Sequence, residues 1–169
     1  MLTNILKNCT IFVDGFGKAG DVETITLPVP SLTIEDFRNG GMDMPVGVPL
    51  GMEKLEMSFV MSALDPQLLN LFGVSPGDRK AFTVRGALVD ELSGEHRAAL
   101  GRVRGIIKTT DAGEWGAGEK ASLTVSVDSI IYYKLEVGDD VVHEIDIETF
   151  TRIINGVDQL KLQRDALGF

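Results

Sequence analysis

The chain has 169 residues, of which 44% are hydrophobic and 24% charged, and this composition excludes an intrinsically disordered protein. The 25 Asp and Glu outnumber the 16 Lys and Arg, so the net charge of −9 argues against a protein that binds nucleic acid through a basic surface. The single cysteine excludes an intrachain disulfide, and the apolar runs fall short of the ~20 residues that a membrane helix needs. We therefore expect one soluble domain over residues 1–169, without membrane insertion or a signal peptide.

Alternation of apolar and polar residues dominates the sequence and predicts antiparallel β-structure. In chain order, the alternating segments lie at 9–14, 21–27, 53–62, 80–90, 97–108, 121–137 and 141–148. The glycine-rich turn 15–20 joins the first two, and Gly138-Asp139-Asp140 joins the last two as a hairpin. Segment 121–137 is far longer than the usual strand of about 5 or 6 residues, which suits a coiled barrel wall or a hairpin that projects from the domain.

Helix signals occur at two places. Asp65 is a typical N-cap, with Pro66 in the first turn and Gly73 beyond the end of a short helix. The stretch from Val157 to Leu167 has an apolar stripe at helical spacing and predicts a C-terminal helix. The expected fold class is therefore mainly β (α+β): an antiparallel β-barrel or sandwich with a short flanking helix and a C-terminal helix.

Residues 38–52 are rich in glycine and proline and predict a long irregular loop, a feature that is usually functional in a compact domain. Apolar side chains recur along this segment, at Met42, Met44, Val46, Val48 and Leu50. A solvated loop has little use for them, so burial against another subunit is one interpretation. The alternative is that these side chains cap the domain's own barrel.

No group of residues has the pattern of an active site. The glycines of 15–20 match G-x-G-x-x-G, but a strand follows where a dinucleotide site needs a helix, so we interpret them as a hairpin turn. His143 points away from Glu144 in a strand, His96 has no second histidine nearby, and Cys9 has no base. We expect no enzyme activity, no catalytic residue, no cofactor and no metal; a hydrolase with an unrecognised site is improbable with so few histidines.

Charges are distributed unevenly between two segments. The strand that contains Arg97, Arg102, Arg104 and Lys108 is basic, whereas residues 135–150 hold six acids and no Lys or Arg. Two interpretations remain open: ordinary solvated faces, or pairing of the two segments across strands or between subunits.

Seven short stretches together carry a resemblance to a known family. They are TLP at 26–28, FRNGGMDMPV at 37–46, GMEKLEMSF at 51–59, GEWGAGEKAS at 113–122, YYKLEV at 132–137, EID at 144–146, and INGVDQL with a following arginine and a final LG at 154–168. In order and spacing they resemble the major tail tube proteins of contractile-tailed bacteriophages and R-type pyocins.

This resemblance implies a structural protein of the virion tail or tailocin particle, assembled in the bacterial host cytoplasm. Such proteins form hexameric rings whose strands join into a larger barrel, and the rings stack into a tube that conducts DNA or ions. The implied partners are the sheath, tape measure, baseplate and terminator proteins, and DNA that passes without specific binding. Two alternatives remain: a tube protein of a type VI secretion-like apparatus, and, with less support, a monomeric small-ligand-binding β-barrel.

The resemblance and the alternation together predict which residues face the channel. Segments 53–62 and 121–136 line it beside 31–38 and 97–108, with Leu55, Met57, Phe59, Leu123, Val125 and Val127 in the core. The lumen-facing residues would be Lys54, Glu56, Ser58, Ser122, Thr124, Ser126 and Asp128. The subunit or ring interface would use the glycine-rich segment, at Arg38, Gly40, Gly41, Met42, Met44, Pro45, Val46, Val48 and Leu50.

Overall fold

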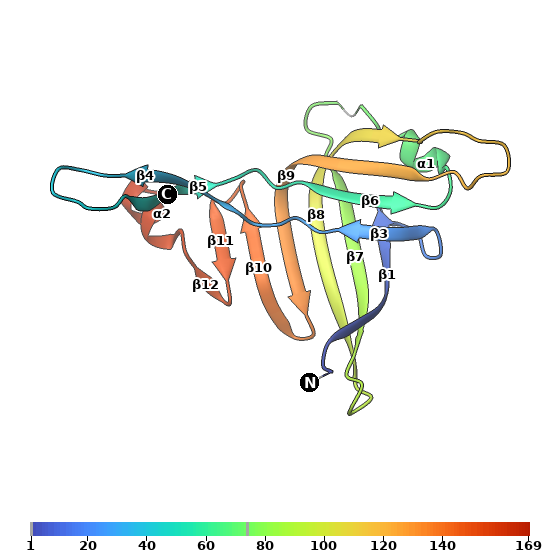
Figure 1. Cartoon of the computed structure of the whole chain (residues 1–169), viewed down its shortest axis with the longest axis horizontal. Coiled ribbons are helices and arrows are strands. Elements are labelled where there is room, and N and C mark those ends of the chain that lie inside the picture. Colours follow the sequence, from blue (N-terminus) through green and yellow to red (C-terminus); the bar gives the residue numbers. More distant parts are fainter. Residues whose placement is uncertain (1, 74) are drawn as a thin grey trace.

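The structure is a computed structural model that describes residues 2–73 and 75–169 (Figure 1). Antiparallel strands dominate it, and both helices are short. The strands are β1 (Ile5–Val13), β2 (Phe16–Gly17), β3 (Val22–Thr26), β4 (Leu32–Phe37), β5 (Val46–Met52), β6 (Met57–Met61), β7 (Lys80–Val89), β8 (His96–Asp111), β9 (Leu123–Val137), β10 (Asp140–Asp146), β11 (Thr151–Ile154) and β12 (Val157–Asp158). The helices are α1 (Pro66–Leu69) and α2 (Lys161–Leu167).

The long strand β9 organises the main sheet, whose order is β12-β11-β10-β9-β8-β7-β1-β2. Its first half, Leu123–Val127, pairs with β6, which in turn pairs with β3; its second half, from Tyr132 onward, pairs with β10. β8 accompanies both halves. One strand therefore belongs to two sections of sheet that share β8.

The two sections meet at a local break in the pairing of β8 with β9. Ser129 adopts a φ of 51°, and the register shifts between Arg104 and Ile106 on the opposite strand. Gly105 occupies that shift, and a Cβ there would lie 2.8 Å from Val127 Cγ1. A glycine is required because any side chain would collide with the core at this bulge.

The core lies inside the curled sheet, where β1, β6, β7, β8 and β9 contribute alternate side chains. Its largest fully buried members are Tyr133, Phe59, Phe82, Ile11, Met61, Leu68 and Ile107. The rings of Phe59 and Phe82 contact at 6.2 Å between centroids. The mainly β class predicted from the alternation is confirmed, but the sheet does not close into a barrel within the part of the chain that the structure describes, because β3 pairs with β6 and not with β1.

The predicted loop at 38–52 is wrong in its second half. Residues from Val46 onward form β5, which pairs with β4 in a separate two-stranded sheet, and only 38–45 remain as the tip. The predicted place of 31–38 beside 53–62 is wrong for the same reason, since β4 pairs with β5. A Cβ at Gly47 would lie 2.7 Å from Ile34 Cγ2, so the glycine that suggested a loop instead permits a close strand pair.

The C-terminal helix is shorter than predicted. Asn155 and Gly156 both have positive φ, at 49° and 76°, and form a hairpin turn that pairs β12 with β11. Residues 157–158 are therefore strand, and α2 begins only at Lys161. Asp158, expected in a first helical turn, instead accepts a hydrogen bond from the backbone N–H of Leu160 and pairs with Arg164 at 2.6 Å.

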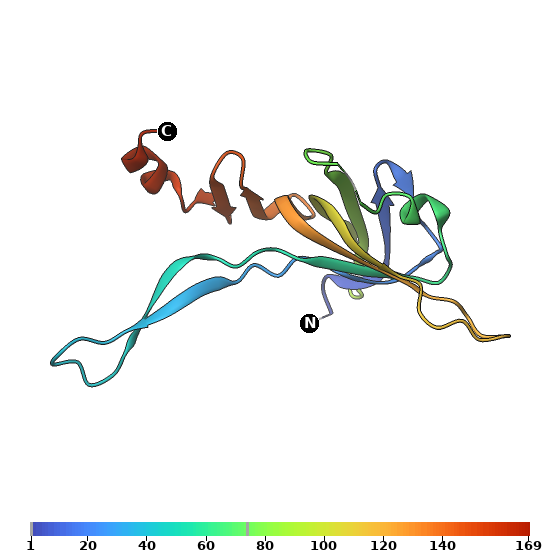
Figure 2. The same cartoon turned by 90° about the horizontal axis from the view of Figure 1, so that it is seen from above.

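Three segments extend away from the core. The β4–β5 hairpin and the segment that holds β10, β11, β12 and α2 project at one end of the molecule as two separate arms (Figures 1 and 2). The loop 112–122 between β8 and β9 projects at the opposite end (Figure 2). Neither helix of the described residues is long and apolar enough to cross a membrane.

A buried ion pair fastens α1 to the body. Lys18, only 6% exposed, pairs with the carboxylate of Asp65, and its Nζ also donates to Gln67 Oε1 at 2.8 Å. Burial alone would raise the pKa of Asp65, but hydrogen bonds from Lys18 and from the backbone N–H of Gln67 outweigh it and hold this pKa below its ordinary value. The pair therefore stabilises the fold at neutral pH and loses this contribution as the pH falls through the lowered pKa of Asp65.

We expect Lys18→Met to lower the free energy of unfolding by about 3 kcal/mol at pH 7, because it leaves the Asp65 carboxylate buried without its partner. The difference from wild type narrows as Asp65 is protonated in acid. Urea unfolding at pH 7 and below pH 4 measures both effects. Lys7→Met, which removes the exposed pair with Glu91, is the control and should cost less than about 0.5 kcal/mol. Equal losses in the two variants would contradict the role of the pair.

Candidate functional site: a polar sheet face and an apolar groove

Four neighbouring strand segments present a polar face opposite to the core. β3, β6, the first half of β9 and the end of β8 lie side by side in that order. Register places Thr26 opposite Ser58, Ser58 opposite Ser126, and Ser126 opposite Thr109, so one row of hydroxyl groups crosses all four strands. These four residues line one shallow hollow.

The residues predicted to face the channel lie on this surface. Lys54 and Glu56 are exposed, and Ser58, Ser122, Thr124, Ser126 and Asp128 are half-buried. The alternating partners Leu55, Met57, Phe59, Leu123, Val125 and Val127 are all buried. Thr26 and Thr109 were missed because alternation within one strand does not tell which neighbouring strand lies beside it.

A charge cluster closes one end of the polar face, at the break in β9. Asp128 accepts hydrogen bonds from Lys54 Nζ at 2.9 Å and from the backbone N–H of Ser129 at 2.6 Å, and Lys108 Nζ lies 3.3 Å away. The bond from Lys54, followed by that from Ser129, lowers the pKa of Asp128 to about 2. Lys54 also pairs with Glu56 at 2.7 Å. Lys54 and Lys108 are therefore both paired with carboxylates.

The charge segments noted in the sequence pair with each other across strands. Arg102 lies 2.8 Å from Glu136, and Arg104 lies 3.8 Å from Glu148. Lys134 adds pairs with Glu136 and Glu144 on the same surface. Of the two interpretations left open by the sequence, pairing across strands is the one that the fold adopts.

The β4–β5 hairpin carries its apolar side chains in water. Met44 is 70% exposed and Leu50 63%, and Val46 and Val48 are exposed as well, so they do not cap the chain's own core. The tip is ordered by local bonds: Arg38 Nε donates to the carbonyl of Met42 at 3.1 Å, and Gly41 turns the chain at a φ of 89°. The remaining predicted interface positions, Gly40 and Pro45, lie in the same tip.

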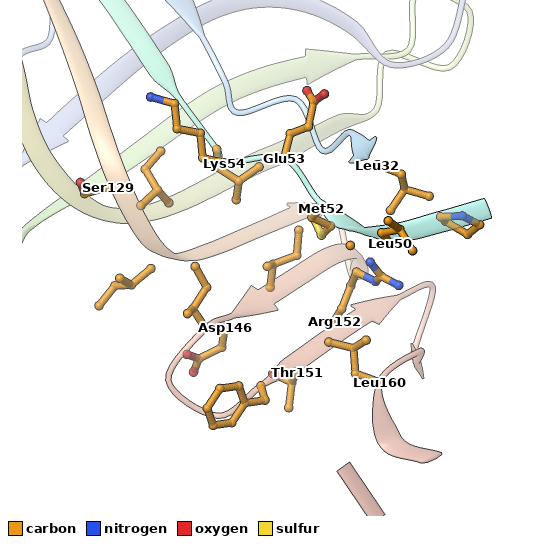
Figure 3. Close-up of a pocket in the computed structure, with 18 of the residues that line it drawn as sticks. Leu32, Leu50, Met52, Glu53, Lys54, Ser129, Asp146, Thr151, Arg152 and Leu160 are labelled. Carbon is orange, nitrogen blue, oxygen red and sulfur yellow. The ribbon is translucent and has the colours of Figure 1, made fainter. Parts of the chain in front are cut away.

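An apolar groove separates the hairpin from the C-terminal arm. It has a volume of about 800 Å³. Figure 3 shows Leu50 and Met52 on the hairpin side and Thr151, Arg152 and Leu160 on the side of the C-terminal arm. Its floor includes Ile130 and Ile131 of β9, directly after the break at Ser129. The sequence does not indicate this groove, because the groove depends on how two arms diverge.

Residues that suggested chemistry do not come together. The ring of His143 lies beside that of Tyr133, with centroids 6.4 Å apart, and burial raises the pKa of Tyr133 to about 12. His96 Nδ1 is 3.0 Å from the carbonyl of Gly94, and Cys9 is a half-buried free thiol. Among the described residues there is no group of three or more His, Cys, Asp or Glu side chains that could hold a metal ion.

Comparison with known proteins relates this chain to phage tail tubes. The family model for the phage tail tube protein FII matches residues 3–168. The chain belongs to this family. It is 28% identical over 166 residues to the tail tube protein of Escherichia phage P2, covering 96% of each chain. It is 32% identical over 149 residues to the major tail tube protein of Serratia phage KSP20, covering 86% of this chain and 84% of the relative.

Solved structures with the same fold come from contractile injection systems. The sheath/tube terminator of the extracellular contractile injection system PVC gives a TM-score of 0.59 at 9% identity, covering 78% of this chain and 95% of that one. A chain of the anti-feeding prophage baseplate gives 0.57 at 12% identity, covering 82% and 99%. At these identities the likeness concerns the fold alone.

The resemblance found in the sequence is thereby confirmed, and the protein is a structural component of the virion tail. A non-enzymatic role follows as the expected one for this family. The polar face, the exposed hairpin and the groove are therefore interpreted as surfaces of a tail tube protein.

We expect Val125→Asp to prevent folding, because Val125 is fully buried and an unpaired carboxylate there costs several kcal/mol. Ser126→Asp should fold with nearly unchanged stability, because Ser126 lies on the opposite, polar face of the same strand. Circular dichroism during thermal unfolding compares the two. Similar behaviour of both variants would show that the assigned facing of β9 is wrong.

Proposed function

We propose that residues 1–169 form a single tail tube domain that assembles into hexameric rings, and that the rings stack into the inner tube of a contractile tail. The observation that carries this proposal is the four-strand segment β3-β6-β9-β8, which has a polar face and two open edges. β3 pairs only with β6 among the described strands, and residues 106–111 of β8 lie beyond the segment that pairs with β7.

These two edges suit head-to-tail pairing between neighbouring subunits. An unpaired strand edge invites association, and a ring that joins β3 of one copy to the end of β8 of the next would pair both of these edges. Four strands from each of six subunits would then form one continuous barrel around a channel. The polar face would line that channel, with the buried side facing each subunit's own core.

The chemistry of the polar face suits the passage of DNA without binding. Hydroxyl groups dominate it, and Lys54 and Lys108 are both held by Asp128. Phosphates therefore find few free cations, and the net charge of −9 per chain adds repulsion. In a tailocin, the same channel would conduct ions.

The proposed partners follow from a tube position. On the outside, the sheath protein would cover the rings, while terminator and baseplate proteins would cap the two ends and the tape measure protein would occupy the channel. The structures of similar fold include a PVC sheath/tube terminator, a PVC sheath-tube complex and an anti-feeding prophage baseplate, which supports the contacts with terminator, sheath and baseplate proteins. Assembly would take place in the host cytoplasm.

Electron microscopy of the purified protein tests the assembly. We expect negative-stain images to show rings of six or stacked tubes, and light scattering to give a mass that is a multiple of six chains. The free monomer leaves the hairpin and two sheet edges in water, so association should grow with concentration. A monomer at every concentration and at moderate salt would contradict the proposal.

We propose that the β4–β5 hairpin makes the contacts between subunits, through its exposed residues from Arg38 to Leu50. A two-stranded sheet with both faces in water is marginally stable on its own, so an apolar partner surface would give the hairpin its stability. The bonds within the tip order the segment before it binds, which lowers the entropy cost of association.

Replacing residues 36–47 by Asn-Gly shortens the hairpin while keeping the pair Glu35–Val48. We expect the variant to fold with a stability close to wild type, since the removed residues contribute nothing to the core, and to form no tubes. Thermal unfolding and microscopy measure the two properties. Normal tubes would contradict the interface role, and an unfolded monomer would show that the hairpin belongs to the chain's own fold.

A further inference from the structure

The loop 112–122 projects at the end of the molecule opposite to the two arms (Figure 2). Trp115 in this loop is 75% exposed. The loop nevertheless has fixed local structure: the Gly113 N–H donates to Asp111 Oδ1 at 2.9 Å, Glu119 N–H donates to the Gly116 carbonyl at 3.2 Å, and Lys120 pairs with Glu23. An ordered loop that holds a tryptophan in water is typical of a binding loop, because tryptophan contributes strongly to interfaces.

The groove between the two arms offers the matching apolar surface. Phe150 and Ile147 on its wall are each 54% exposed, and Leu50 is exposed on the facing hairpin. The groove volume of about 800 Å³ exceeds that of an indole ring, so it can take a tryptophan together with its neighbouring residues.

Arg152 gives the groove a specific electrostatic requirement. Its Nε is buried and has no hydrogen-bond partner among the described residues, and it forms no ion pair with the groove carboxylates Glu53 and Asp146. Figure 3 shows its guanidinium between β11 and the hairpin strand. Arg79, also at the groove, makes one hydrogen bond, to the carbonyl of Ser129 at 3.4 Å. The Nε–H group of Arg152 is therefore a buried donor that needs an acceptor, and the residues that the structure describes supply none.

The tryptophan loop carries the missing acceptors. Glu114 directly precedes Trp115, and Glu119 lies in the same loop; within the described part of the chain neither forms an ion pair. Because loop and groove lie at opposite ends of the molecule, one chain cannot join them. Two chains can, head to tail, and such a contact repeats indefinitely along one direction.

We propose that Trp115 of one copy inserts into the groove between the hairpin and the C-terminal arm of a second copy, with Glu114 or Glu119 accepting hydrogen bonds from Arg152. This inference rests on the proposed assembly into stacked rings and assigns the contact to the junction between one ring and the next. The other candidate occupant of the groove, a sheath or terminator protein, is an outcome of the test below.

Assembly of variants tests the contact. We expect Trp115→Ala to fold as wild type and to form rings, with tubes at least tenfold shorter by electron microscopy. Leu92→Ala, at an equally exposed apolar residue of the β7–β8 turn, is the control and should leave tube length unchanged. Tubes of normal length from Trp115→Ala would overturn the inference while leaving the proposed function intact. The absence of rings in the wild-type protein would instead overturn the proposed function.

Cross-linking tests the geometry. In a Cys9→Ser background, a chain carrying Ala117→Cys, two residues after Trp115, and Ile147→Cys should form a ladder of disulfide-linked multimers on oxidation, because each copy keeps Trp115 and has both halves of the contact. Leu92→Cys with Ile147→Cys should give none. Equal ladders in both, or no ladder from the first, would overturn the inference. The absence of a ladder in tubes of normal length would show that the second copy does not occupy the groove, which would leave it open to a sheath or terminator protein.

Discussion

The backbone of strand β9 forms hydrogen bonds with two different sections of sheet, and the rest of the structure depends on this double pairing. A straight strand would keep one pair of neighbours along its length. Here the positive φ of Ser129 and the bulge at Gly105 turn the strand, so that β6 pairs before the turn and β10 after it. The polar face lies on the section before the turn, and the C-terminal arm follows the section after it. The groove begins directly after the turn, at Ile130 and Ile131.

Apolar side chains are buried in the core of the chain but exposed to water in the segments that project from it. Fully buried side chains such as Phe59, Phe82 and Tyr133 lie inside the curled sheet. Large apolar side chains of the hairpin, the C-terminal arm and the loop 112–122 lie in water. Hydrophobic burial drives association as it drives folding, so these three segments are suited to contacts with a second chain.

Alternation in the sequence was sufficient to predict the mainly β class and the long strands, because one face of each packs on the core. Val125 and Ser126 are neighbours that show this effect. Val125 is fully buried in the core, whereas Ser126 is half-buried on the opposite, polar face. The same signal failed for β5, where both faces are exposed and Gly47 and Pro49 imitate a loop. It failed again at β12, where the Asn155-Gly156 turn overrides a helical apolar stripe.

The candidate surfaces divide in a similar way. Residues of the polar face could be named from the alternation within single strands, but their neighbours Thr26 and Thr109 depend on which strands pair. The groove depends on the divergence of two arms. Nothing in the sequence around Arg152 indicates that its Nε is buried in that groove. The local sequence pattern thus predicts which face of one strand is buried. Surfaces that several elements form together depend on the tertiary arrangement and are not predicted by it.

The exposed apolar faces of the hairpin also determine how temperature acts on the protein. Surface such as that of Ile34, Phe37 and Leu50 has a large hydration heat capacity, so covering it lowers the heat capacity of the system. The attraction between apolar surfaces weakens on cooling, because near room temperature its origin is entropic. The proposed contact of this hairpin with another subunit would therefore weaken in the cold, while the enclosed core of each subunit would stay folded.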